Sequence, residues 1–131
     1  MRPANIFTVI QRKDNFMRGI VWAYDTEDAI TQLLQIEEDY KHLGIEPVNK
    51  VIGKQHDSYI SFANGDMWRV VRACDSGRGY AANVSYIDMR ISQEVIDTII
   101  KHATKSWPYQ AFKFYLPWTG KDEEIEAKFI Y

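Results

Sequence analysis

The segment "RGYAANVSYIDMRIS" (residues 78–92) decides the fold, because it joins an apolar strand to the start of a helix. Residues 82–88 form a short apolar run that ends in the carboxylate Asp88, and such a run between turn residues is typical of a buried strand. Ser92 follows with a side-chain oxygen suited to a helix N-cap. A buried strand followed at once by a helix indicates an α/β protein.

The residues on the C-terminal side continue this alternation. Apolar side chains recur at helical spacing after Ser92, at Val95, Ile96, Ile99, Ile100 and Ala103. This spacing predicts a helix through about Thr104. The segment "YQAFKFYLP" (109–117) then predicts another strand, with Phe112 and Phe114 on one face and Tyr115 on the other.

The N-terminal half predicts the same kinds of elements. The runs 6–12 and 19–24 are rich in β-branched and aromatic residues and predict strands. The residues that follow the second strand predict a helix over 25–43, with Asp25 or Thr26 as its N-cap and Gly44 as the residue that stops it. Asn64-Gly65, within "SYISFANGDMWRVVRA" (58–73), predicts a β-hairpin.

Strands that alternate with helices predict one α/β domain over residues 1–131. We expect a mixed, mostly parallel sheet, flanked by helices, with an inserted β-hairpin at Asn64-Gly65. Neither a repeat nor a linker divides the sequence. The predicted domain is therefore the whole chain.

Composition and charge narrow the possible classes of function. The chain has 131 residues, a net charge of -2 and a single cysteine, Cys74, which argues against a disulfide framework or a thiolate zinc site. The three histidines are scattered, without the spacing of metal ligands on a helix. No apolar stretch approaches the length of a bilayer span, and the first residues lack the apolar region of a signal peptide. We therefore expect a cytoplasmic protein, in the host cytoplasm if it is phage-encoded, with no cofactor and no membrane association.

The order of these segments resembles the ATPase domain of phage large terminases and of related helicase-like motors, over residues 19–120. "YISFANGDMWRVVRA" is similar to the hairpin of that family, and "GRGYAANVSYID" to its arginine-glycine loop and Walker B strand. "AFKFYLPWTG" lies where the strand of the coupling motif would be. The resemblance implies a P-loop-ATPase-like core.

Three departures from the family pattern argue against catalysis. The chain has no phosphate-binding loop of the form G-x-x-x-x-G-K-S/T. Met89 stands where the catalytic glutamate would be, and a thioether cannot orient the attacking water. Pro117, Trp118 and Thr119 replace the small hydroxyl pair of the coupling motif. The resemblance therefore predicts a degenerate ATPase without activity.

Such a chain is expected to act by binding. The resemblance predicts a phage or mobile-element protein that docks on a motor ATPase, or on another protein of DNA metabolism or defence, and modulates or inhibits it. One alternative is an ATPase subunit that completes a nucleotide site in trans, with Asp88 holding magnesium and Arg78 contacting phosphates. Asp88 alternatively caps the turn into the next helix, and Arg78, between two glycines, alternatively lies in a tight turn in solvent.

A nucleic-acid-binding module is the other alternative. Basic and aromatic residues of the kind that neutralise and stack nucleic acid gather in one part of the sequence. They are Trp68, Arg69, Arg72, Arg78, Tyr80 and Arg90. The competing interpretation is a hairpin with ordinary strand aromatics and solvated charges.

A dense aromatic run near the C-terminus is the candidate protein interface, because exposed aromatics are good interface anchors. The candidate anchors are Trp107, Tyr109, Tyr115 and Trp118. A strand buried on both faces by helices would explain the same run equally well. The sequence leaves the partner's identity and the oligomeric state open.

Overall fold

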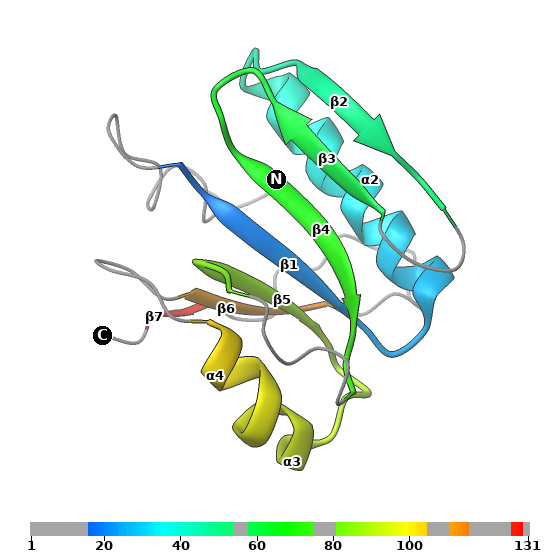
Figure 1. Ribbon diagram of the computed structural model, residues 1–131, viewed down its shortest axis with the longest axis vertical. Coiled ribbons are helices and arrows are strands. Elements are labelled where there is room, and N and C mark those ends of the chain that lie inside the picture. Colours follow the sequence, from blue (N-terminus) through cyan, green and yellow to red (C-terminus); the bar gives the residue numbers. More distant parts are fainter. Residues whose placement is uncertain (1–15, 54–57, 75–80, 105–110, 116–126, 130–131) are drawn as a thin grey trace.

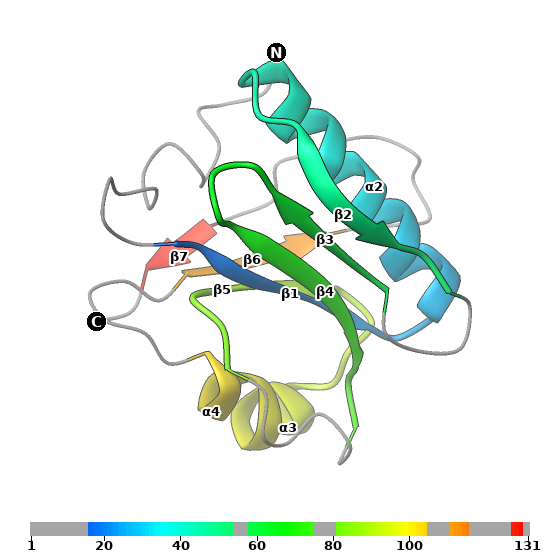
Figure 2. The ribbon, with the colours of Figure 1, turned by 45° about the horizontal axis from the view of Figure 1, so that its top comes forward.

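A computed structural model of the chain describes residues 16–53, 58–74, 81–104, 111–115 and 127–129. Its strands form one seven-stranded sheet in the order β2-β3-β4-β1-β5-β6-β7 (Figure 1). Helix α2 lies on one face of this sheet, and α3 and α4 lie on the other (Figure 2). The architecture is therefore an α/β domain with a mixed sheet between two helical layers.

The central strand β1 (Arg18–Ala23) leads directly into the long helix α2 (Thr26–His42). Asp25 is the N-cap, and its side chain accepts hydrogen bonds from the backbone N–H groups of Glu27 and Asp28. These acidic residues of the first turn also complement the helix dipole. The helix ends at His42, and Gly44, just after the C-cap Leu43, has a φ of 78°, a conformation that glycine adopts at little cost.

Strands β2 (Pro47–Val51), β3 (Tyr59–Phe62) and β4 (Met67–Arg72) form the antiparallel end of the sheet. Residues 63–66 connect β3 to β4, and Gly65 has a φ of 97° in this turn. Strand β4 then pairs with β1 in parallel, with Gly19 opposite Trp68.

The other half of the sheet contains β5 (Val84–Asp88), β6 (Ala111–Tyr115) and β7 (Ala127–Phe129). Between β5 and β6 lie α3 (Gln93–Val95), the π-helical turn η2 (Ile96–Ile100) and α4 (Lys101–Ala103). Ser92 is the N-cap, as predicted, because its hydroxyl accepts a hydrogen bond from the Val95 N–H.

Each face of the sheet has its own hydrophobic core. The core under α2 includes Leu33, Ile36, Tyr40, Trp68 and Tyr86. The core under α3 and α4 includes Trp22, Ile87, Ile96, Ile100 and Phe112. Strands β1 and β5 contribute to both cores, so the centre of the sheet is buried on both faces, as parallel strands in α/β proteins generally are.

The predicted α/β class, the strand at 19–24 and the helices after Asp25 and Ser92 are confirmed. The sheet is less parallel than predicted, because the three central pairings are parallel and the three outer ones are antiparallel. The predicted strand at 6–12 lies outside the described residues. Strand β2 was not predicted, since Pro47, Asn49 and Lys50 obscure its pattern.

A buried polar network ties α2 to β4. The Tyr40 hydroxyl accepts a hydrogen bond from Trp68 Nε1 at 2.9 Å and donates one to Asp66 Oδ2 at 2.7 Å. Asp66 Oδ1 also accepts the Met17 N–H at 2.8 Å. Burial, and next the charge of Asp66, raise the pKa of Tyr40 far above its usual value, so the phenol stays protonated and remains a donor.

Replacing Tyr40 by Phe is expected to lower the free energy of unfolding by about 2 kcal/mol, because Trp68 Nε1 and Asp66 lose a buried partner. The measurement is urea unfolding monitored by tryptophan fluorescence. The raised pKa of Tyr40 also means that stability falls as pH rises above about 10, where a tyrosine of the unfolded chain ionises. A Tyr40→Phe protein as stable as the wild type would show that the network contributes nothing.

Candidate functional site

The carboxyl ends of β1, β4, β5 and β6 lie at one edge of the sheet, because these four strands are parallel. In the sheet, β4 lies on one side of β1, and β5 and then β6 lie on the other side. Ligands of open α/β sheets bind outside the carboxyl ends of the strands, where the strand order reverses. The ends of β1 and β5 are therefore the expected position of a ligand site.

Asp88, at the end of β5, is held by the residue two positions later. Its Oδ1 accepts the backbone N–H of Arg90 at 2.8 Å and Arg90 Nε at 3.0 Å. Its Oδ2 accepts Arg90 Nη2 at 2.7 Å. The Asp88 side chain is 0 % exposed. This aspartate caps the turn after β5, which is the alternative to magnesium binding that the sequence analysis gave for Asp88.

Arg90 links this turn to helix α2. Its Nη2 also lies 2.7 Å from Asp28 Oδ2, and its guanidinium lies 4.7 Å from the centre of the Tyr24 ring. The hydrogen bonds to Asp88, and next those to Asp28, raise the pKa of Arg90 above its usual value. The guanidinium is thus a fixed cation between two carboxylates, and it joins the ends of β1 and β5.

The Asp88 carboxylate is therefore already occupied by a cation of the chain itself. In the described part of the chain, no group of three or more His, Cys, Asp and Glu side chains is placed to hold a metal ion. Magnesium binding by Asp88 would require Arg90 to leave both carboxylate oxygens. The geometry at Asp88 is that of an ion-paired cap.

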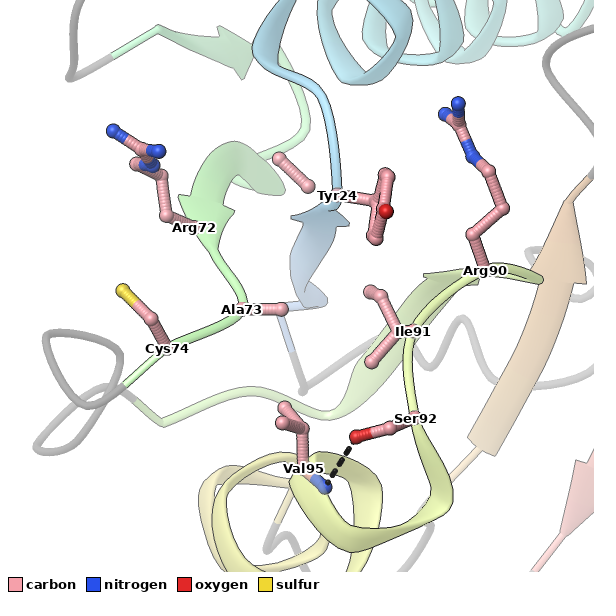
Figure 3. Close-up of a pocket in the computed structure, with 9 residues that line it drawn as sticks. Tyr24, Arg72, Ala73, Cys74, Arg90, Ile91, Ser92 and Val95 are labelled. Atoms are coloured by element: carbon pink, nitrogen blue, oxygen red, sulfur yellow. Dashed lines mark hydrogen bonds between the residues drawn. The ribbon is translucent and has the colours of Figure 1, made fainter.

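A pocket of about 310 Å³ opens beside this ion pair (Figure 3). Its residues come from the ends of β1 and β4, the segment after β5 and the start of α3. They are Ala23, Tyr24, Arg72, Ala73, Cys74, Arg90, Ile91, Ser92 and Val95. Figure 3 shows Tyr24 between the two arginines, with Ala73, Ile91 and Val95 on the side toward α3.

The structure separates the residues of the expected nucleic-acid site. The prediction that Trp68 belongs to that site is wrong. Its side chain is fully buried in the core under α2 and cannot stack on a ligand. Trp68 and Val71 belong to opposite cores, and side chains alternate along a strand. Arg69 therefore shares a face with Val71, and Arg72 points to the opposite face.

Two further members of that grouping, Arg78 and Tyr80, lie outside the described residues. Arg90 is engaged by Asp88 and Asp28, so its charge is locally compensated. Of the predicted grouping, the described residues bring only Arg72 and Arg90 together, at the pocket.

The aromatic candidates divide in the same way. The prediction of Tyr115 as an interface anchor is wrong. Its side chain is buried, and its hydroxyl donates a hydrogen bond to the Trp22 carbonyl at 2.8 Å. Burial, and next the charge of Asp88, raise its pKa. Tyr115 is thus a core residue rather than an interface anchor. Trp107, Tyr109 and Trp118 lie outside the described residues.

Sequence reasoning missed an exposed surface at strand β2. Among the strands that the structure describes, β2 pairs only with β3, so its other side forms an open edge of the described sheet. Val48 is 67 % exposed, and Val51 and Ile52 are each 42 % exposed. Val48 and Val51 are three positions apart, with polar residues between them, so they lack the two-residue alternation that indicates a strand.

No family model, curated protein or solved structure matches the chain. None of the described helices is long and apolar enough to cross a membrane.

Proposed function

We propose that the protein is a non-catalytic binding protein that takes up an extended segment of a protein partner at the open edge of β2. The observation that carries this proposal is the open edge itself with its exposed apolar side chains. A strand at the end of a sheet presents unpaired N–H and C=O groups, which another polypeptide can pair with.

The usual protection of an edge strand is weak over the second half of β2. Pro47 and an irregular pairing between Pro47 and Asn49 interrupt the first half. Lys50 is the only charged residue of the strand, and its Nζ is drawn back to Glu37 of α2 at 2.9 Å. Val51 and Ile52 consequently form an exposed apolar end at this edge of the described sheet.

The chemistry of this edge favours a polypeptide over nucleic acid. Backbone donors and acceptors that alternate along β2 match an extended main chain, and apolar side chains on the partner would cover the exposed valines. Lys50, the cation within β2, is already paired with Glu37, so it offers little to a phosphate backbone. The proposed occupant is an extended segment of another protein with apolar side chains at alternate positions.

The resemblance to terminase-like motors supports the class of partner. We propose that the chain keeps a P-loop-ATPase-like skeleton without its catalytic residues, and that it docks on a motor ATPase or another protein of DNA metabolism or defence. The strand that resembles a Walker B strand, β5, supports this by its burial between two parallel neighbours and by ending in Asp88. Phage or mobile-element origin and an inhibitory role belong to the same proposal.

Replacing Val51 by Lys is expected to weaken partner binding roughly tenfold or more, because a lysine must be desolvated in the new strand pair. Folding should be nearly unaffected, since Val51 is an exposed position. The measurement uses a photo-crosslinking amino acid in place of Val48 in a nuclease-treated host lysate. Cross-linked proteins are identified by mass spectrometry, and their affinity is then measured with purified components.

The matched control is Met89→Lys, because Met89 is 44 % exposed and lies at the end of β5, away from β2. Binding that survives Met89→Lys and fails in Val51→Lys supports the proposal. A cross-link only to a second copy of the chain would replace the partner with self-association. Cross-links that are indifferent to Val51→Lys, or the absence of any cross-linked protein, would overturn the β2 edge as the binding surface.

A further inference from the structure

We propose that the pocket at the carboxyl edge binds a small organic anion with a flat apolar body. The pocket is lined by residues after β1, β4 and β5 and is separate from β2, so this site is independent of the proposed partner binding. Its position, outside the carboxyl ends of parallel strands, is the one where open α/β sheets bind ligands.

The floor of the pocket is apolar and fixed by the fold. Ala23 and Ala73 lie side by side at the ends of β1 and β4. The Ala73 N–H donates a hydrogen bond to the Ala23 carbonyl at 3.1 Å. Ile91 is buried, and Val95, the last residue of α3, packs on the same core. Such a floor favours a hydrophobic ligand body, as in most small-molecule sites.

Tyr24 supplies an aromatic wall that is both exposed and held in place. Its side chain is 61 % exposed, an unusual degree of exposure for a large aromatic group. The Arg90 guanidinium lies 4.7 Å from the ring centre and is itself fixed by Asp88 and Asp28. Because the ring is positioned before a ligand arrives, stacking on it costs little conformational entropy.

Arg72 supplies the charge that a ligand can use. The structure gives no ion pair between Arg72 and another described residue, whereas Arg90 is engaged by two carboxylates. Arg72 is exposed at the rim of the pocket (Figure 3). A guanidinium in such a position binds carboxylate or phosphate through paired hydrogen bonds.

The volume limits the size of the ligand. About 310 Å³ lies near the lower end of the range for small-molecule sites. A single aromatic ring with one anionic group fits this space, whereas a larger ligand would extend beyond the lining residues. An aromatic carboxylate and an aromatic monophosphate share this chemistry.

The test is an NMR titration of the full chain with four probes: phenyl phosphate, benzoate, phenol and inorganic phosphate. We expect phenyl phosphate or benzoate to shift the amide signals of Ala73, Ile91 and Val95. Phenol and inorganic phosphate should each bind roughly tenfold more weakly, because each lacks one half of the recognised chemistry. Binding of only one of the two aromatic anions identifies the anionic group that the site recognises.

Arg72→Gln should lower the affinity for the aromatic anion roughly tenfold, a loss typical of a charge-assisted hydrogen bond. The matched control is Arg69→Gln, on the same strand but outside the residues that line the pocket, which should leave the affinity unchanged. Val51→Lys should also leave it unchanged, so failure of this site and failure of the β2 proposal are distinguishable.

Three results would each overturn the proposal. The first is equal binding of phenol and phenyl phosphate, the second is an affinity indifferent to Arg72→Gln, and the third is no shift of the pocket amides up to about 10 mM probe.

Discussion

The Arg90→Ala protein is expected to unfold with a free energy about 3 kcal/mol lower than that of the wild type. The change leaves Asp88, which is 0 % exposed, without the cation that neutralises it and without two side-chain hydrogen bonds. It also removes the bridge from β5 to Asp28 and the contact with Tyr24. Thermal and urea unfolding measure the loss.

The Asp88→Asn change separates the ion pair from the packing of the long arginine side chain. In the Arg90→Ala background, Asp88→Asn should restore part of the lost stability, because the stranded side chain no longer carries a charge. In the wild-type background the same change should destabilise. A double-mutant cycle with additive effects would show that the two side chains are not coupled, contrary to the geometry.

Local sequence patterns predicted the elements whose signals are short-range. The N-caps at Asp25 and Ser92 and the strand ending at Asp88 follow from neighbouring residues, and the structure has them. The partners of Arg90 could not be predicted in the same way, because Asp28 is 62 positions away and meets it only when β1 and β5 pair. The basic grouping in the sequence therefore overstated the charge available to a ligand.

The burial of Trp68 also could not be predicted from local sequence. Sequence alternation places it on one face of β4, but only the sheet order decides which face is covered by α2. A tryptophan in a hairpin with nearby arginines resembled a stacking residue, and the parallel pairing with β1 buried it. The pocket escaped prediction for a similar reason, because its lining residues come from segments that are distant in the sequence.

Gly19→Ala is expected to destabilise the protein by about 3 kcal/mol, at the upper end for overpacking by one methyl group. Gly19 lies opposite Trp68 in the β1–β4 pairing, and an added Cβ would lie 2.1 Å from Trp68 Cε3. The indole cannot easily move away, because its Nε1 donates to Tyr40 and its ring meets Tyr86 edge-on at 5.2 Å. Urea unfolding measures the effect.

A comparison with Gly44→Ala isolates the steric cause. Gly44 has a φ of 78° but nothing within 4 Å of an added Cβ, so that change should cost only about 1 kcal/mol of backbone strain. Trp68→Leu makes room for the methyl group at the expense of a large loss of its own. If the indole is the obstacle, Gly19→Ala should add little further loss in the Trp68→Leu background. An equal loss in both backgrounds would assign the effect of Gly19→Ala to the backbone of β1 and not to the packing of Trp68.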